Sequence, residues 1–472
     1  MSALDKKRDL TNGPLFFKIT LFALPIMLTG FLQIAYNMAD NIIVGRFSGD
    51  PNALAAVGCT GSLNSLIVNV LMGIAAGTGV VVSQFFGAGD RKAVSATTHT
   101  AMTFSALVGI LFGAIGLAVS RPALVLLGTK PEVLDSAVLY FRIICIGIPA
   151  NTVYNFGAAI LRGTGNSRVP LLILGSAGIV NVCLNLLFVI GFGMSVAGVA
   201  IATVTAQYLS AVAVVAVLAT RRGESFCLTL RALGISGEYL KRILRQGIPA
   251  GIQSSTYAVA NVLMTGAVNT FTTATVTANS IASNIDAITL TSLTCFGQAS
   301  MTFCGQNFGA RKPDRVKKTL IYCIIQAMLS GIIVSSLELI FADPIISLYI
   351  SDDAQNRAEI MAATLTIIRI MLPTYIIFGL LDVPSGGLKG LGKSVSAMII
   401  NIVCICGVRV LWILAIFPMI GTLTGLFLTY PVSWTVAFVV AITTFILSYR
   451  AFKRDCSTPP SDKADALSEK SI

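Results

Sequence analysis

Charged residues are scarce in this sequence. Only 11% of its 472 residues are Asp, Glu, Lys or Arg, whereas 55% are hydrophobic and the mean hydropathy is +0.83. Soluble domains carry about 25% charged residues, so the composition excludes an ordinary soluble protein. It predicts an integral membrane protein that crosses the bilayer many times.

Histidine and paired cysteine motifs are almost missing as well. His99 is the only histidine, which excludes a histidine-based metal or catalytic centre. The ten cysteines form no Cys-x-x-Cys motif and lie mostly in apolar runs, where cysteine behaves as a small hydrophobic residue. We therefore expect no disulfide, no cofactor and no enzymatic chemistry.

Long apolar runs are what the sequence has instead. A window of about 20 apolar residues marks a membrane-spanning helix. Twelve such spans are predicted, at 16–44, 53–82, 94–119, 133–160, 169–190, 194–220, 246–271, 277–304, 318–341, 358–386, 395–417 and 420–449.

The positive charges lie in the short loops between these runs. Of the 33 Lys and Arg residues, 26 fall on the side of the two termini, four on the opposite side and three inside spans. Because cytoplasmic loops are enriched in Lys and Arg, both termini are predicted to be cytoplasmic, in the cell membrane. This placement also argues against nucleic acid as a partner, although the net charge is +12.

The two halves of the chain repeat each other. Pro25 corresponds to Pro249, Gln84 to Gln306, Pro149 to Pro373 and Arg162 to Lys389, at offsets of 222 to 227 residues. The fold class is therefore predicted as all-α, with twelve transmembrane helices in two six-helix pseudo-symmetric bundles and a substrate cavity between them. The predicted parts are the bundles 1–220 and 246–450, a cytoplasmic linker 221–245, and a disordered tail 451–472.

One acid stands out in the first span. Asp40 lies in a nearly continuous apolar run from Pro25 to Gly45. An ionised carboxylate at membrane depth costs roughly 2.5–3.5 kcal/mol, so such a residue usually faces a cavity or a partner and handles an ion or proton. The alternative is a hydrated residue near the outer end of the helix.

The repeated elements resemble those of the multidrug and toxic compound extrusion (MATE) family. The resemblance rests on the Pro25 segment with Asp40, the Gln-x-x-Gly-Ala motif at Gln84 and Gln306, and the two loops 162–167 and 389–394. It covers about residues 14–450 and implies a secondary antiporter that exports organic, often cationic, compounds in exchange for H+ or Na+.

The resemblance also implies a coupling site around Asp40. Asn181 and Thr203 match polar residues that face the acid, and Asn155 is a looser match. Asn185 stands where many members carry a second acid, which leaves one carboxylate for H+ or Na+. No other metal is expected.

Substrate contacts are predicted from polar and aromatic residues on spans 1, 7, 8 and 10. Asp286 and Asp382 either attract substrate or carry a proton; the alternative is a structural pairing with Arg369 or Arg409, because unpaired charge is costly in hydrocarbon. The predicted cavity residues are Gln33, Tyr36, Asn37, Gln253, Tyr257, Asn261, Asp286 and Asp382.

A multidrug antiporter is therefore the predicted function, acting as a monomer on small molecules within the lipid bilayer. A lipid-linked oligosaccharide flippase of a related fold is the main alternative, supported by the intramembrane residues Arg142, Arg369 and Arg409. A receptor or scaffold is a further alternative, but the sequence offers no long soluble domain for it.

Overall fold

The computed structural model describes residues 9–48, 52–350 and 356–457, and this part of the chain is helical without strands. The first ten predicted spans each fall on one long helix, the fifth together with its π turn, and the last two each fall on several helical segments. The first half contains α2 (Leu15–Phe47), α3 (Ala53–Ala88), α4 (Arg91–Leu126), α5 (Pro131–Gly163), α6 (Arg168–Leu186) with the π turn η1 (Leu187–Gly191), and α7 (Val196–Thr220).

The second half begins with the short η2 (Leu230–Ala232) and contains the other six spans. They are formed by α8 (Gly237–Val268), α9 (Thr273–Gly309), α10 (Pro313–Ile340) with the short α11 (Ala342–Ser347), α12 (Arg357–Gly390), α13 (Ser394–Ile400), η3 (Asn401–Gly407), α14 (Val408–Leu411), η4 (Trp412–Ile416), α15 (Phe417–Ile420), α16 (Leu423–Phe427) and α17 (Thr429–Ser457).

Three predicted boundaries differ from the structure. The eleventh span is not one continuous α-helix, because two π-helical segments, η3 and η4, interrupt it on either side of α14. Helix α8 begins at Gly237, inside the predicted linker. Helix α17 continues to Ser457, so the predicted tail is helical at its start, and its remainder lies outside the described residues.

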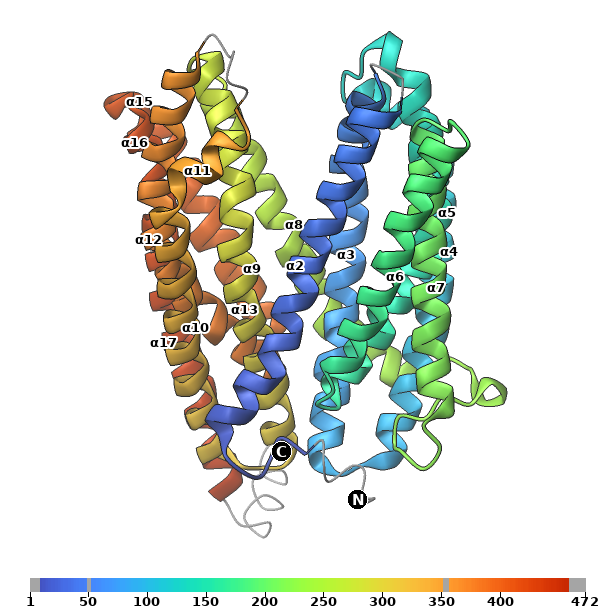
Figure 1. Ribbon diagram of the computed structural model, residues 1–472. Coiled ribbons are helices and arrows are strands. Elements are labelled where there is room, and N and C mark those ends of the chain that lie inside the picture. Colours follow the sequence, from blue (N-terminus) through green and yellow to red (C-terminus); the bar gives the residue numbers. More distant parts are fainter. Residues whose placement is uncertain (1–8, 49–51, 351–355, 458–472) are drawn as a thin grey trace.

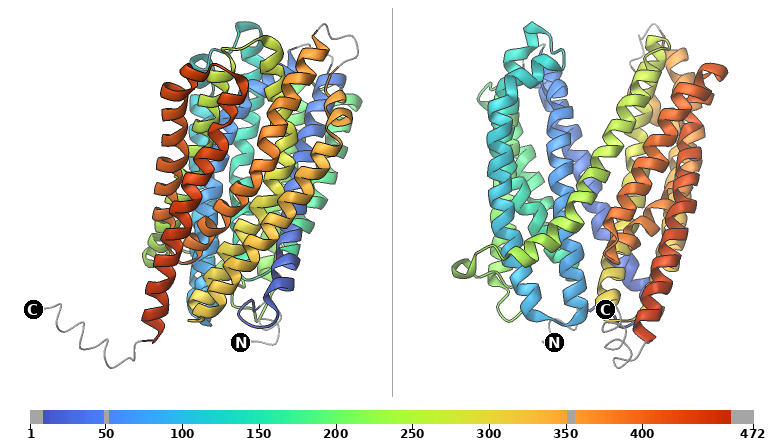
Figure 2. Two further views of the ribbon diagram at one scale, coloured as in Figure 1. Left: turned by 90° about the vertical axis from the view of Figure 1, so that its left-hand side faces the viewer. Right: turned by 180° about the vertical axis from the view of Figure 1, so that it is seen from behind.

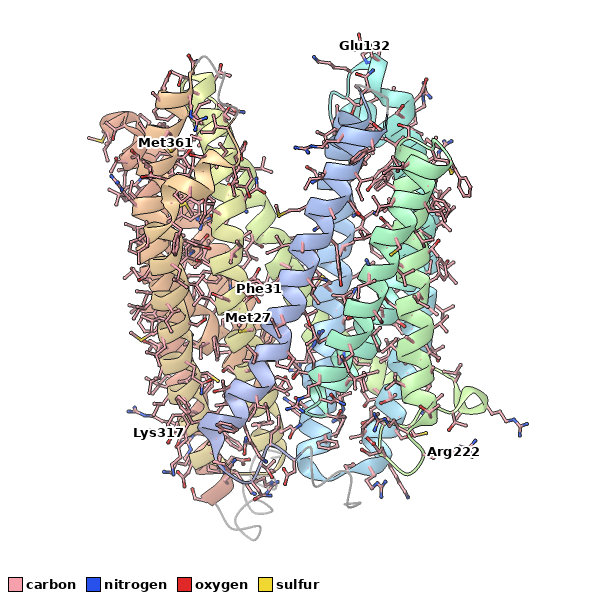
Figure 3. All side chains as sticks on the ribbon, viewed as in Figure 1. Met27, Phe31, Glu132, Arg222, Lys317 and Met361 are labelled. Carbon is pink, nitrogen blue, oxygen red and sulfur yellow. The ribbon has the colours of Figure 1, made fainter. Side chains whose placement is uncertain are left out.

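The helices form two bundles that diverge at one end (Figure 1). Helices α2 to α7 make one bundle and α8 to α17 the other, and the start of α2 and the end of α17 lie where the bundles converge. The two further views show the same separation (Figure 2). Arg222 and Lys317 lie at the converging end, whereas Glu132 lies at the diverging end (Figure 3).

The first helix of each half crosses between the bundles. The early part of α2 contributes Ile19 and Phe22 to the hydrophobic core of the second half, where Phe22 meets Phe303 edge-to-face with ring centroids 5.6 Å apart. Conversely, Ile243 of α8 is buried in the core of the first half. This exchange of helices, which apolar runs alone do not reveal, joins the bundles at their converging end.

Reciprocal hydrogen bonds close the converging end. The Gln84 side-chain amide donates to the Gly390 carbonyl at 2.8 Å, and the Gln306 amide donates to the Gly163 carbonyl at 2.9 Å. All four residues belong to the internal repeat, so each half supplies one donor and one acceptor to the other. We call this set of contacts the glutamine clamp.

Glycines allow the clamp to form. A Cβ added at Gly87 would overlap the Gln306 carbonyl, and one added at Gly309 would overlap the Gln84 carbonyl. Further along, Gly73 and Gly77 of α3 lie against the backbone of α8 near Gly251 and Gly247. Small residues let membrane helices approach closely, and these helices come from different halves.

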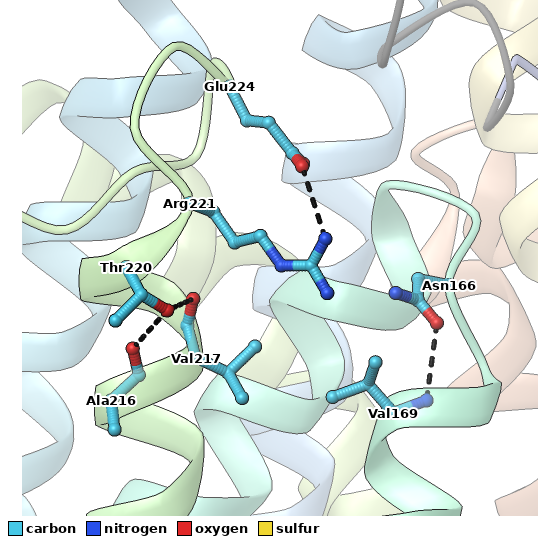
Figure 4. Close-up of polar contacts among 7 residues, drawn as sticks. All are labelled: Asn166, Val169, Ala216, Val217, Thr220, Arg221 and Glu224. Carbon is cyan, nitrogen blue, oxygen red and sulfur yellow. Dashed lines mark hydrogen bonds and ion pairs between the residues drawn. The ribbon is translucent and has the colours of Figure 1, made fainter.

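The segment between the halves is held by the only histidine. His99 accepts a hydrogen bond from the Thr229 amide at 3.0 Å, and Thr100 accepts one from the Ser236 amide at 3.2 Å. At the start of the segment Arg221 and Glu224 form an ion pair of 3.7 Å, next to the C-terminal turn of α7 (Figure 4). His99 therefore has a structural role in the fold.

The close packing at the clamp predicts that Gly87→Ala lowers the stability of the protein. The added methyl group must displace the α9 backbone, and overpacking of this kind costs about 1–3 kcal/mol. We expect a lower melting temperature for the purified protein in detergent, measured by intrinsic fluorescence. Gly61→Ala is the matched control on the same helix, because a Cβ there meets nothing within 4 Å. Equal melting temperatures for the two variants would contradict a tight clamp.

Candidate functional site

A polar cluster surrounds Asp40 inside the first bundle. The Asn185 amide donates to Asp40 Oδ1 at 2.5 Å, and the Thr203 hydroxyl donates to Asp40 Oδ2 at 3.4 Å. Asn185 also donates to Asn181 Oδ1 at 3.3 Å, and the Asn181 amide donates to Thr203 at 3.4 Å. Helices α2, α6 and α7 thus bring together four of the residues expected to form the coupling site.

Helix periodicity explains how α6 supplies two amides. Asn181 and Asn185 are four residues apart, which places them on the same helix face, one turn after the other. Both are buried, and Asn185 Oδ1 has no hydrogen-bond partner among the described residues. The cluster therefore offers one carboxylate together with amide and hydroxyl oxygens. These are hard oxygen ligands, suited to a proton or a small cation.

Two residues change the predicted picture of this cluster. Asn155 lies apart from it, because its amide bonds Asn151 one turn earlier and its side chain lines the central cavity instead. Tyr140 of α5, which the sequence did not single out, lies within electrostatic range of Asp40. Tyr140 lies in an apolar run, so the sequence gave no indication that it comes close to Asp40.

A central cavity of about 390 Å³ lies between the bundles. This volume is within the range of sites that bind drug-sized ligands. Four of the predicted cavity residues line it, namely Gln33, Gln253, Tyr257 and Asp382. Its charged lining residues are Arg162, Asp382 and Lys389.

The other four predicted cavity residues lie elsewhere. The Tyr36 hydroxyl donates to the Leu174 carbonyl at 2.9 Å, and its ring occupies the space that a side chain at Gly178 would need. Tyr36 is thus fixed against α6. Asn37 and Asn261 are exposed residues that do not line the cavity, and Asp286 lies within the second bundle.

Asp286 forms a second acidic group with a residue that the sequence did not reveal. Asp286 accepts a hydrogen bond from the Tyr375 hydroxyl at 2.9 Å. Glu338 of α10 lies within electrostatic range of it, is 5% exposed, and accepts a hydrogen bond from Thr289 at 2.6 Å. Glu338 falls near the end of a predicted span, so its sequence position gave no indication that it is buried beside another acid.

The alternative pairing of Asp286 and Asp382 with arginine is not found in the described part of the chain. Among the described residues no ion pair joins Asp286 or Asp382 to Arg369 or Arg409. Arg409 instead lies over the Tyr430 ring, 4.1 Å from its centroid, and donates to Ser433 at 3.4 Å.

A family model matches both halves of the chain. The MatE model covers residues 25–187 and 249–414, one segment in each half, which together make up well over half of the sequence. The chain belongs to the MATE family. The two matched segments also agree with the internal repeat.

Individual relatives span nearly the whole chain. "Probable multidrug resistance protein YoeA" of Bacillus subtilis is 26% identical over 430 residues, covering 89% of this chain and 91% of that protein. The "FAD transporter" of Shewanella oneidensis is 22% identical and covers 90% of this chain and 93% of its own. A solved MOP superfamily transporter from Pyrococcus furiosus has a TM-score of 0.88 at 22% identity, covering 95% of this chain and 99% of that structure.

MATE membership makes this chain a multi-pass membrane protein that exports drugs or toxic compounds, in a family of transporters rather than enzymes. The flippase alternative is not favoured by these relatives. The three arginines that supported the flippase alternative do not line the cavity, namely Arg142, Arg369 and Arg409. Arg142 instead donates to Ser120 at 3.0 Å.

Asn185→Asp tests the oxygen cluster. The substitution places a second carboxylate beside Asp40, and a pair of carboxylates binds Na+ more strongly than a single one. We expect Na+, compared with choline at equal ionic strength, to stabilise the variant more than the wild type. At a Na+ concentration 100 times its dissociation constant the gain would be about 2.7 kcal/mol.

The readout is the melting temperature of purified protein. Asn261→Asp, at an exposed position outside the cluster, is the matched control and should respond as the wild type does. A Na+ response of Asn185→Asp equal to that of the control would contradict a cation-binding cluster at Asp40.

Proposed function

We propose that this MATE protein is a cation-coupled antiporter, in which entry of H+ or Na+ through Asp40 drives export of organic compounds from the central cavity. The observation that carries the proposal is the polar cluster in which the half-buried Asp40 meets the buried Asn181 and Asn185. This cluster is separate from the cavity, but Asp40 lies on a helix that lines it. No covalent chemistry is needed. The sequence left H+ and Na+ open as coupling ions, and both are kept here.

The orientation follows from the distribution of charge. The loops at the converging end carry most of the Lys and Arg residues. We therefore place the transporter in the cell membrane with this end facing the cytoplasm. The glutamine clamp then closes the cytoplasmic side, and the bundles diverge toward the outside. We expect the transporter to act as a monomer.

Helix α2 supports coupling between the two sites. Gln33 lines the cavity and Asp40 lies seven residues, or about two turns, further along the same helix. The beginning of α2 packs in the second bundle, and its later part contacts α6 through Tyr36. A shift of α2 at Asp40 therefore changes contacts in both bundles and in the cavity.

Coupling requires that the cation bind the two conformations with different affinities. In the outward-open state the Asp40 cluster is accessible to cations from outside. Once Asp40 is neutralised, its hydrogen bonds from Asn185 and Thr203 weaken, because both donate to the charged carboxylate. One elementary charge crossing about 100 mV supplies roughly 2.3 kcal/mol, which is enough for a modest substrate gradient.

Substitution of Asp40 tests the proposal. Asp40→Asn keeps the size and hydrogen-bonding capacity of the side chain but cannot alternate between charged and neutral forms. We expect the variant to insert and fold normally, since it removes a buried charge, and to lose uphill export. The measurement is substrate transport in proteoliposomes under separately imposed H+ and Na+ gradients.

Asp135→Asn is the matched control, because Asp135 is exposed and pairs only with Arg121, at 2.9 Å, in the described ion pairs. It should transport like the wild type. Asp286→Asn and Asp382→Asn should retain ion-driven transport while changing which substrates are exported. Uphill export at the wild-type rate by Asp40→Asn would move the coupling role to Asp286 or Asp382.

A further inference from the structure

Two basic side chains line the central cavity at equivalent positions of the two halves. Arg162 near the end of α5 and Lys389 near the end of α12 both line it. They stand in the repeated sequences Leu-Arg-Gly and Leu-Lys-Gly, 227 residues apart. Each half of the transporter therefore presents one positive charge to the same space.

Neither Arg162 nor Lys389 has a direct hydrogen bond or ion pair from its side chain to any described residue, although Lys389 also lies within electrostatic range of Asp382. Asp382 is the only acid among the lining residues and lies two turns before Lys389 on α12. The lining thus carries two positive charges against one negative charge.

The backbone next to each cation is fixed. Gly163 and Gly390, the residues that follow Arg162 and Lys389, are the two acceptors of the glutamine clamp. The two charges are therefore held at the clamped end of the cavity. Basic residues that only orient the chain in the membrane belong in loops, whereas these two line the cavity between the bundles.

The remaining lining suits an amphipathic molecule. Gln33, Gln253 and Gln298 supply amide groups, and Tyr154 and Tyr257 supply aromatic rings. Tyr257 meets the Phe378 ring edge-to-face at 6.5 Å. Aromatic side chains accept flat apolar bodies, and the paired cations supply the charge-assisted hydrogen bonds that a carboxylate, phosphate or sulfonate group accepts.

We propose that the central cavity binds organic anions, with the acidic group of the ligand held between Arg162 and Lys389. The proposal rests on the function above and specifies its substrate class, replacing the cationic drugs expected from the family resemblance. Export of an anion in exchange for an entering cation moves both charges down an inside-negative potential, so the two movements reinforce each other.

Binding of two matched dyes tests the proposal directly. Carboxyfluorescein and rhodamine 123 share a xanthene ring system, but the first is an anion and the second a cation at neutral pH. With wild-type protein in phosphatidylcholine nanodiscs, fluorescence polarisation should show tighter binding of carboxyfluorescein, weakened by added salt. Tighter binding of rhodamine 123 would overturn the proposal.

Variants locate the site of binding. We expect Arg162→Gln and Lys389→Gln each to weaken carboxyfluorescein binding about ten-fold, since each removes one charged donor. Lys389→Arg keeps the charge and should bind nearly as the wild type does, while Asp382→Asn should bind the anion more tightly. Arg142→Gln is the matched control, because Arg142 lies on the same helix as Arg162 and does not line the cavity.

Loss of affinity in Arg162→Gln and Lys389→Gln no greater than in Arg142→Gln would overturn the proposal. If either Gln variant fails to fold, the comparison of the two dyes on the wild type and on Lys389→Arg and Asp382→Asn still decides it. Displacement of the dye by added phosphatidylglycerol in the wild type, reduced in Lys389→Gln, would support the proposal and identify a lipid phosphate as the anion.

The binding data separate this proposal from the antiport mechanism. Carboxyfluorescein bound with the expected dependence on Arg162 and Lys389, but not driven uphill by H+ or Na+ in proteoliposomes, would contradict the antiport mechanism alone. Ion-driven uphill export of rhodamine 123 combined with no binding of carboxyfluorescein would contradict the anion site alone.

Discussion

The reciprocal glutamine clamp is the contact on which the rest of the structure depends. Each half of the chain donates one side-chain amide to a glycine carbonyl of the other, and glycines at the same level bring the backbones together. Gly163 and Gly390 are the last residues of α5 and α12, where the final carbonyls of a helix have no partner within the helix, so each glutamine satisfies one of them. The closed end of the molecule is thus stabilised by the internal repeat itself, and the bundles can separate only at the opposite end.

Two charged sites follow from this arrangement, and they differ in kind. The Asp40 cluster lies within one bundle, is half-buried at Asp40 and has its hydrogen-bond donors already in place. The cavity lies between the bundles, and the side chains of Arg162 and Lys389 that line it make no direct hydrogen bond or ion pair with the described residues. A site within one bundle that supplies its own donors suits a small ion, whereas a site between the two bundles, with charged groups free of direct hydrogen bonds, suits a larger ligand that arrives and leaves. Helix α2 is the physical link, because it carries Asp40, lines the cavity with Gln33 and packs in both bundles.

The sequence was most informative where a single physical rule dominates. Exclusion of polar groups from hydrocarbon produces the long apolar runs, and those runs predicted the helices. The cluster of Asp40, Asn181, Asn185 and Thr203 was also placed correctly in space, through family resemblance; its coupling role stays a prediction. Both results depend on patterns that are local in the sequence or repeated within it.

Contacts between distant helices were not predictable in this way. The crossing of α2 and α8 between bundles, the burial of Glu338 beside Asp286 and the fixing of Tyr36 by Gly178 depend on packing partners more than 40 residues away in the chain. The charge of the cavity was missed for a related reason. Arg162 and Lys389 lie next to predicted loops and were assigned to short connections, although their side chains line the interior.

The central claim is that occupation of Asp40 shifts the balance between two arrangements of the bundles. Leu126, the last residue of α4, and Leu348, which follows α11, are 88% and 86% exposed and belong to opposite bundles. Spin labels at these positions, with the ten native cysteines replaced, would report the separation by pulsed electron paramagnetic resonance. The account predicts a shorter distance when the pH is lowered or Na+ is added, and a distance that does not respond in Asp40→Asn. A wild-type distance indifferent to both ions, or an equal response in Asp40→Asn, would contradict it.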